Sequence, residues 1–492
     1  MTRGRGPGGG TRGSVLASAL GAALLATALP VSLVPSLAAW TDREWVHAPT
    51  LGTDRYDCGS DDAYATAASG TFLSGTVGGA DLSAVAGVPG VSAARSGSEP
   101  ATVTPDTASH VDAGDADTGT DTYANPLTVD AVGIDVLALS GLNAGLPVGS
   151  IGVLNQYAQV ANTGYSAGAS GLITDSGAVA VAPTSPDLPE PATIDLAGVL
   201  PEGLAGARLT VGAVAASSQL DWCAASESAA WGDGSVTGST REYGIASLGL
   251  VLDSPIVVSL TADVRAGIAS MLADSSTLNL GAGSPVDTLL SATLTGSGLS
   301  IDLARGTISV DLESLLTDDL GLNGRAANTA LTLDPARVAA VAAQTEALLA
   351  EWSAAVTAEL RAVVPAILPT GGLIGPVLSA TNRALNLITA ELTATVSALT
   401  ATLETTVGGA AVALTGFFDA LPGVLSLTVN VQPDQPGAPP GAPFTAATPP
   451  DDSAQYRVSA LRVGLLNHAV AGAELAVVNF ATASAGSNTR LP

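Results

Sequence analysis

The chain has 492 residues, of which 47% are hydrophobic, 3% are aromatic and 12% are charged, and its formal net charge at pH 7 is −27. It contains no lysine, so its side-chain cations are arginines and protonated histidines. Sparse cations argue against binding to nucleic acid, because phosphate contacts need clustered positive charge. The acidic balance also disfavours anionic lipid, and the apolar fraction is large enough to bury a substantial core.

Residues 1–39 have the features of an export signal. Arg3, Arg5 and Arg12 precede an apolar run over residues 14–29, and small residues at 36–39 provide a cleavage site. The run is short for a bilayer-spanning helix, so a retained anchor is the less favoured alternative. We therefore expect a mature chain that begins near Trp40, is secreted or associated with the cell wall, and does not contact the membrane after cleavage.

Cys58 and Cys223 are the two cysteines of the chain. In an exported protein an even pair more often forms a disulfide than a catalytic thiol. We predict a bond between them, which would stabilise the fold by about 4 kcal/mol in the chain-entropy model. Two cysteines and three scattered histidines give no zinc-ligand spacing, so we expect no metal site of that kind.

Most of the chain has the short, Gly-broken apolar runs of β-strands. Residues 299–312 alternate on both sides of Arg305-Gly306, which predicts a hairpin. The remaining expected strands include residues 69–75, 127–132, 151–154, 178–181, 208–215, 243–252 and 425–431, and two more in 456–482. Residues 100–122 are polar and acidic, so we expect an exposed loop there.

Helices are expected where an N-cap residue precedes a proline. Ser254-Pro255 predicts a helix that extends to about residue 273, and Asp334-Pro335 predicts a second helix. A third apolar stripe begins near Pro376, after a Pro/Gly break, so the last two helices should pack as an antiparallel hairpin.

These elements predict a mainly β protein, in which a β-sandwich-like body carries an inserted α-helical hairpin (a β-rich α+β fold). The expected organisation is a signal peptide at 1–39, a β-rich body at 40–333, the helical hairpin at 334–407, and strands completing the body at 408–492. A Pro-rich connection is expected at 433–450.

Several sequence blocks, in this order, resemble the choice-of-anchor G family of secreted actinobacterial surface proteins. The blocks are residues 40–47, 69–75, 123–127, 241–248 with 253–255, 460–466 and 473–476. The resemblance implies an exported surface protein of a Gram-positive bacterium with no known enzymatic activity and no catalytic residues to carry over. The chain departs from the family pattern at Leu491-Pro492, where an apolar tail and a basic stop would be expected.

Gly164-Tyr-Ser-Ala-Gly168 matches the nucleophile-elbow pattern of serine hydrolases, in which Ser166 would be the nucleophile and His468 the base. That mechanism needs Ser166 on a tight strand-to-helix turn, but residues 169–182 are Gly-broken and strand-like. A Gly/Ser-rich loop explains the match equally well, so the hydrolase is an alternative hypothesis.

Asp112, Asp115, Asp117 and Asp121 form an acidic run that suggests a calcium-dependent binding module as a second alternative. An EF-hand loop started at Asp115 would need Gly at its sixth position and Glu at its twelfth, and the chain has Thr120 and Pro126 there. A solvated loop explains the charges better.

The leading prediction is therefore a non-enzymatic structural or adhesive protein of the cell surface. We assign it no catalytic residue, no metal ligand and no cofactor. Its expected partner is an extracellular ligand or cell-wall component that the sequence does not identify, and its oligomeric state is open.

Overall fold

The computed structural model describes residues 64–77, 80–83, 88–111, 119–127, 144–145, 154–174, 176–181, 188–189, 191–196, 206–232, 237–274, 280, 282–363, 377–440, 454–466 and 474–492. All of them belong to one compact unit, residues 56–492. The expected signal peptide, the strands expected at 128–132 and 151–153 and most of the Pro-rich connection lie outside the described residues.

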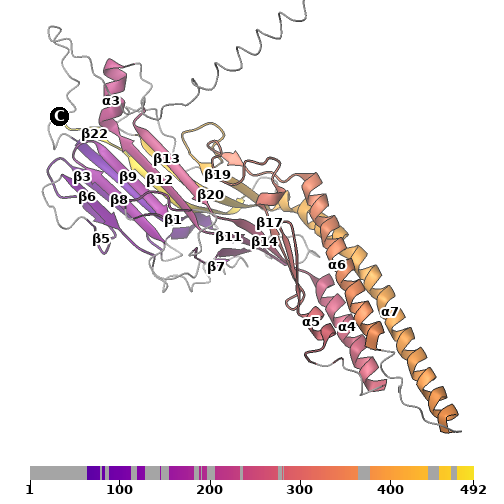
Figure 1. Cartoon of the computed structure of the whole chain (residues 1–492). Helices are drawn as coiled ribbons and strands as arrows, with labels where there is room; N and C mark the ends of the chain where they lie inside the picture. Colours follow the sequence, from indigo (N-terminus) through magenta and orange to yellow (C-terminus); the bar gives the residue numbers. More distant parts are fainter. Residues whose placement is uncertain are drawn as a thin grey trace, which may run out of the picture. The chain divides into compact units, whose positions relative to one another are not determined.

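The described residues form three antiparallel sheets and a group of helices, which confirms the predicted β-rich α+β class (Figure 1). Sheet A has the order β18-β19-β20-β21-β1-β3-β4, and β2 and β22 also pair with β1. Its strands are β1 (Tyr64–Val77), β2 (Ala80–Asp81), β3 (Val91–Ser96), β4 (Thr102–Thr104), β18 (Thr329–Ala330), β19 (Leu425–Val431), β20 (Gln455–Leu466), β21 (Glu474–Gly486) and β22 (Thr489–Arg490).

Sheet B lies against sheet A and completes a sandwich. Its order is β13-β12-β9-β8-β6-β5, and β8, β9 and β12 contact β1 and β21 of the facing sheet. The strands are β5 (Ser109–His110), β6 (Thr120–Ala124), β8 (Asn155–Ala161), β9 (Tyr165–Gly171), β12 (Val214–Asp221) and β13 (Ser239–Ile245). Strands β4, β5 and the start of β6 fall within residues 100–122, so the expectation of an uninterrupted loop there was wrong.

Sheet C has the order β15-β16-β17-β14-β11-β10-β7. Its strands are β7 (Ala144–Gly145), β10 (Ala192–Asp195), β11 (Ala207–Val211), β14 (Leu248–Asp253), β15 (Thr293–Gly296), β16 (Leu299–Asp302) and β17 (Thr307–Asp311). Strands β16 and β17 confirm the hairpin predicted at 299–312. Leu250 and Ile308 are buried on the inner face of this sheet, whereas Thr210 and Ser309 on the outer face are half-buried.

One long hairpin connects sheets B and C. The predicted strand at 208–215 is two strands, β11 in sheet C and β12 in sheet B, and the predicted strand at 243–252 is likewise split into β13 and β14. Both breaks occur at the same level, where Gly212 N–H donates to Ser247 O at 2.9 Å and Ala246 N–H donates to Ala213 O at 2.8 Å. The ribbon therefore keeps its pairing while it passes from one sheet into the other.

The helices are α3 (Trp222–Trp231), α4 (Pro255–Asp274), α5 (Pro285–Leu290), α6 (Pro335–Val363) and α7 (Val377–Ala420), with single 3₁₀ turns η3 (Glu313–Leu315) and η5 (Leu421–Gly423). Helices α6 and α7 form the predicted hairpin, and α4 packs beside α7 (Figure 1). Ser254 Oγ accepts from Val257 N–H at 3.3 Å, and Asp334 Oδ1 accepts from Ala336 N–H at 2.9 Å, which confirms both predicted caps.

The second helix of the hairpin is longer than expected. It continues to Ala420, past the predicted boundary at residue 407 and through Gly408-Gly409. Val407, Ala410 and Leu414 stay buried on one helical face, so packing outweighs the poor helix propensity of the glycine pair.

Helix α4 illustrates how apolar these helices are. Pro255–Ala273 is long enough, with a mean hydropathy of 1.5, to cross a membrane by length and composition alone. One such helix is weak evidence for a span, and Val257, Leu260 and Val264 belong to the main core cluster together with sheet C and α7. Of that stretch 33% is buried, so packing accounts for part of its apolar character.

Candidate functional sites

The serine of the nucleophile-elbow pattern is part of the sandwich interior. Ser166 lies in the middle of the sheet, in strand β9, and is 0% exposed. Its hydroxyl donates to Asn488 Oδ1 at 3.0 Å and accepts from Gly486 N–H at 3.1 Å, both on the facing sheet A side. The local geometry is therefore a paired strand and not a strand-to-helix turn, which contradicts the elbow interpretation. The proposed base, His468, lies outside the described residues.

Ser166 belongs to a set of hydrogen bonds that join the two sheets through buried polar side chains. Ser218 Oγ donates to Tyr456 O at 2.7 Å, and Thr66 Oγ1 donates to Ala161 O at 3.0 Å. Phe72 N–H donates to Gln156 Oε1 at 2.9 Å. These bonds satisfy polar groups that would otherwise be buried at a cost, so they hold the sheets in one register.

The sheets can approach this closely because their facing residues are small. A Cβ atom built on Gly70 would overlap the backbone oxygen of Ala169, and one built on Gly168 would overlap the backbone oxygens of Ser69 and Ser484. Backbone thus lies directly against backbone here. The abundance of Ala, Gly and Ser in β9, β12 and β21 is explained by this contact.

Of the four aspartates in the acidic run, the structure describes Asp121. Asp121 lies in β6 and pairs with Arg95 at 2.5 Å, and its carboxylate also accepts from Ala101 N–H at 3.3 Å. His110 Nε2 lies 3.4 Å from Asp121 Oδ1. Asp121 is therefore engaged within the chain, while Asp112, Asp115 and Asp117 lie outside the described residues. Within the described part of the chain, His, Cys, Asp and Glu form no group of three or more that could hold a metal ion.

The structure describes one of the two cysteines of the predicted disulfide, Cys223. Cys223 lies in the first turn of α3, beside Trp222, whose ring packs on Tyr64 with centroids 5.4 Å apart. The described part of the chain has no free cysteine. Cys58 lies outside the described residues, so the Cys58–Cys223 bond stays a prediction.

A polar cluster that sequence patterns did not reveal joins β13 to the segment after β19. Arg241 forms a bidentate ion pair with Asp434, with Nη2 and Oδ2 2.9 Å apart, and the two side chains are 9% and 6% exposed. The Arg241 guanidinium also lies 5.8 Å from the centre of the Tyr456 ring. These residues lie 193 positions apart in the chain, so only the three-dimensional structure brings them together.

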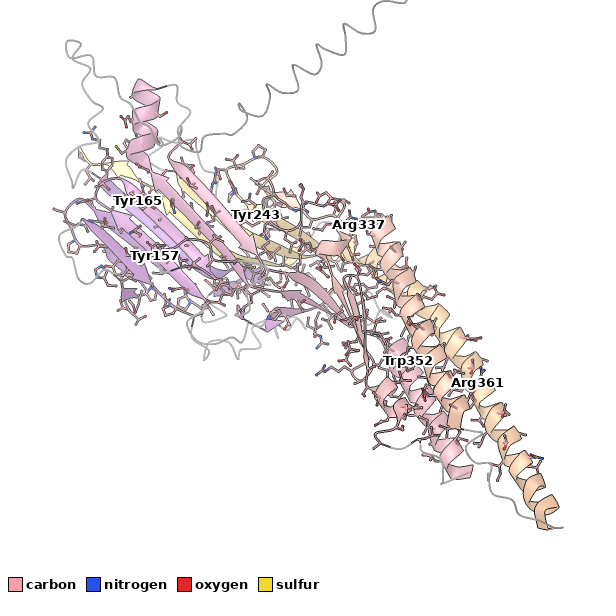
Figure 2. The ribbon with its side chains drawn as sticks, viewed as in Figure 1. Tyr157, Tyr165, Tyr243, Arg337, Trp352 and Arg361 are labelled. Atoms are coloured by element: carbon pink, nitrogen blue, oxygen red, sulfur yellow. The ribbon has the colours of Figure 1, made fainter. Side chains whose placement is uncertain are left out.

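A second buried arginine, Arg325, stabilises the neighbouring loop at residues 318–325. Arg325, whose side chain is 4% exposed, pairs with Asp318 at 2.6 Å, and its N–H donates to the Tyr243 hydroxyl at 2.9 Å. The hydrogen bond from Arg325 holds the pKa of Asp318 below its ordinary value. Burial raises the pKa of Tyr243, and the contacts with Arg325 oppose that shift. Figure 2 shows Tyr243 on β13, in the same sheet as Tyr165 on β9 and Tyr157 on β8.

The outer face of sheet C offers an open hollow of about 400 Å³, whose exposed lining is mainly apolar with hydroxyl groups set into it. Its lining residues come from five adjacent strands and are mainly small and hydroxylated. They include Thr210, Gly249, Thr295, Ser300, Ser309 and Asp311. Pairing places Ser309 beside Val251 on one side and Ser300 on the other, so hydroxyl groups stand side by side across the strands. This arrangement suits a hydroxyl-rich ligand that hydrogen-bonds to several strands at once.

Together the fold and these sites define a β-rich α+β protein. Ser166, the serine of the nucleophile-elbow pattern, is buried and hydrogen-bonded between its two packed sheets. A family model described as a domain of unknown function (DUF8394) matches residues 68–279, 273–368 and 362–486. These ranges cover most of the chain, so the protein belongs to this family. No curated protein and no solved structure shows significant similarity to the chain.

Proposed function

We propose that this is an exported, non-enzymatic structural or adhesive protein, displayed on or shed from the surface of a Gram-positive bacterium. The leader-like residues 1–39 and the resemblance to choice-of-anchor G proteins support the location. The observation that carries the adhesive role is the open hollow on sheet C, where four of its five strands place hydroxyl groups among apolar side chains. Its ligand in this proposal is a hydroxyl-rich cell-wall or extracellular polysaccharide.

The use of Ser166 supports the non-enzymatic part of the proposal. Both hydrogen-bonding roles of its hydroxyl are taken up between the sheets, and the side chain is fully buried. A nucleophile needs access to substrate and an adjacent base. A fluorophosphonate probe that labels the native protein at Ser166 would overturn this part of the proposal.

The location is tested by fractionation of the producing cells and mass spectrometry of the mature N-terminus. We expect the protein in the cell wall or medium, with a new N-terminus near Trp40. Recovery of the intact chain from the cytoplasm would contradict export.

The adhesive role is tested by binding of the full chain to purified cell walls and to a panel of soluble polysaccharides. Ser309→Tyr fills the hollow, and Thr307→Tyr is a matched control on the same strand and the same face but outside the hollow. We expect Ser309→Tyr to lose binding and Thr307→Tyr to retain it. Equal binding by both variants would show that the ligand does not bind in the hollow on sheet C.

A further inference from the structure

A second hollow, apolar in character, lies where the start of α4, the end of β14, the start of β17 and the last turns of α7 meet. It has a volume of about 280 Å³. Leu252 and Ile308 line it from the sheet, and Ile256, Leu414 and Phe417 line it from the helices. The cavity is distinct from the hollow of about 400 Å³, which opens on the opposite face of sheet C.

The polar groups at the edge of this cavity are already engaged within the chain. Ser254 Oγ caps α4 by accepting from Val257 N–H, and Ser254 N–H donates to Gly306 O at 2.9 Å. The Asp253 carboxylate pairs with Arg208 at 3.1 Å. The lining therefore makes no demand for hydrogen bonds from an occupant, and the matching ligand chemistry is hydrocarbon.

Gly416 keeps the cavity open on the α7 side. A Cβ atom built on it would have no neighbour within 4 Å, so no packing inside the chain requires glycine there. Val412, one turn earlier on the same helical face, is 73% exposed and extends the apolar surface beside the cavity.

We propose that this cavity binds an unbranched hydrocarbon chain of roughly ten carbons, carried by a single amphiphile with an uncharged head group. The size follows from the volume, because an apolar cavity of about 150 Å³ holds benzene. The head group stays at the opening, beside Asp253. Of the described residues that line the cavity, Asp253 alone is charged, and because Arg208 pairs with it, the opening offers an anionic head group no compensation for its lost hydration.

The test is calorimetric titration of the full chain with n-alcohols from hexanol to decanol, each below its solubility limit. We expect affinity to rise about fourfold for each added methylene, because each buried CH₂ contributes a fixed transfer free energy. Decanoate should bind at least threefold more weakly than decanol. A flat dependence on chain length would overturn the hydrocarbon site, and equal binding of decanoate would overturn the assignment of the head group.

Gly416→Leu places a side chain in the cavity, and Gly408→Leu is its matched control in α7. Gly408 also has no neighbour within 4 Å of a built Cβ, but it does not line the cavity. We expect Gly416→Leu to lose decanol binding at least tenfold and Gly408→Leu to bind like the wild type. Ala413→Leu, also at the cavity, replaces Gly416→Leu if circular dichroism shows that the latter does not fold. Wild-type affinity in a folded cavity variant would overturn the proposal.

Discussion

Replacement of Ser166 by alanine separates its structural role from a catalytic one. The change removes a donor to Asn488 Oδ1 at 3.0 Å and an acceptor for Gly486 N–H at 3.1 Å, inside an interface where Ser166 is 0% exposed. Asn488 Oδ1 keeps a bond from Ala67 N–H at 3.4 Å, whereas the Gly486 N–H loses its side-chain acceptor. A buried unsatisfied group costs about 1–3 kcal/mol, so we expect the free energy of unfolding to fall by about 2 kcal/mol.

The assay is urea denaturation of the wild type and Ser166→Ala, followed by circular dichroism and by tryptophan fluorescence. Ser92→Ala is the matched control, because Ser92 is an exposed serine in strand β3, and its stability should stay within about 0.5 kcal/mol of the wild type. A hydrolase with Ser166 as nucleophile predicts lost activity with unchanged or increased stability. If Ser166→Ala were as stable as the wild type, the Ser166 hydroxyl would not stabilise the contact between the two sheets.

Three further changes test other contacts. Gly168→Ala should lower the free energy of unfolding by about 3 kcal/mol or more, because backbone of the facing sheet occupies the space of the new methyl group. Gly408→Ala in α7 should raise the free energy of unfolding by about 0.5–1 kcal/mol. Urea denaturation midpoints measure both changes. Asp434→Ala should cost about 3–5 kcal/mol by leaving Arg241 buried without its partner, and a double change of both residues to leucine should recover part of that loss in the same assay. Asp318→Asn should be less stable than the wild type at pH 7. Because the pKa of Asp318 is lowered in the folded state, that difference should begin to shrink below about pH 4 and be lost as the pH falls through the lowered pKa. A constant difference in acid unfolding would contradict the ion pair.

Elements set by local signals were predictable from the sequence. The cap and proline at Ser254-Pro255 placed the start of α4 correctly, and strand alternation placed β19 at Leu425–Val431. Both signals act within a few residues of the element that they define. The end of α7 was predicted too early, at residue 407, because the buried face that carries the helix onward through Gly408-Gly409 is set by packing against α4.

The passage of one ribbon between two sheets could not be predicted in the same way. Residues 208–211 alternate and Gly212-Ala213 interrupts the pattern, but a glycine inside a strand does not say which sheet the next residues join. The break is defined by its partner strand, where Ala213 and Ala246 lie opposite each other. Pairing over more than 30 residues of sequence decides which sheet each half joins.

Ser166 shows how a sequence motif can be present without the chemistry that it usually indicates. A Gly-x-Ser-x-Gly sequence is what an elbow requires, but here Gly168 lets β9 lie against the backbone of β1 and β21, and Gly164 lies in the turn before β9 with the Tyr64 ring beside it. A chain with 3% aromatic residues has few large side chains with which to fill a wide gap between sheets. It closes the gap by bringing the sheets together, and buried hydroxyl and amide groups then bond across the narrow interface. In such a sandwich the serines and glycines form part of the core, so added volume should harm stability more than lost volume.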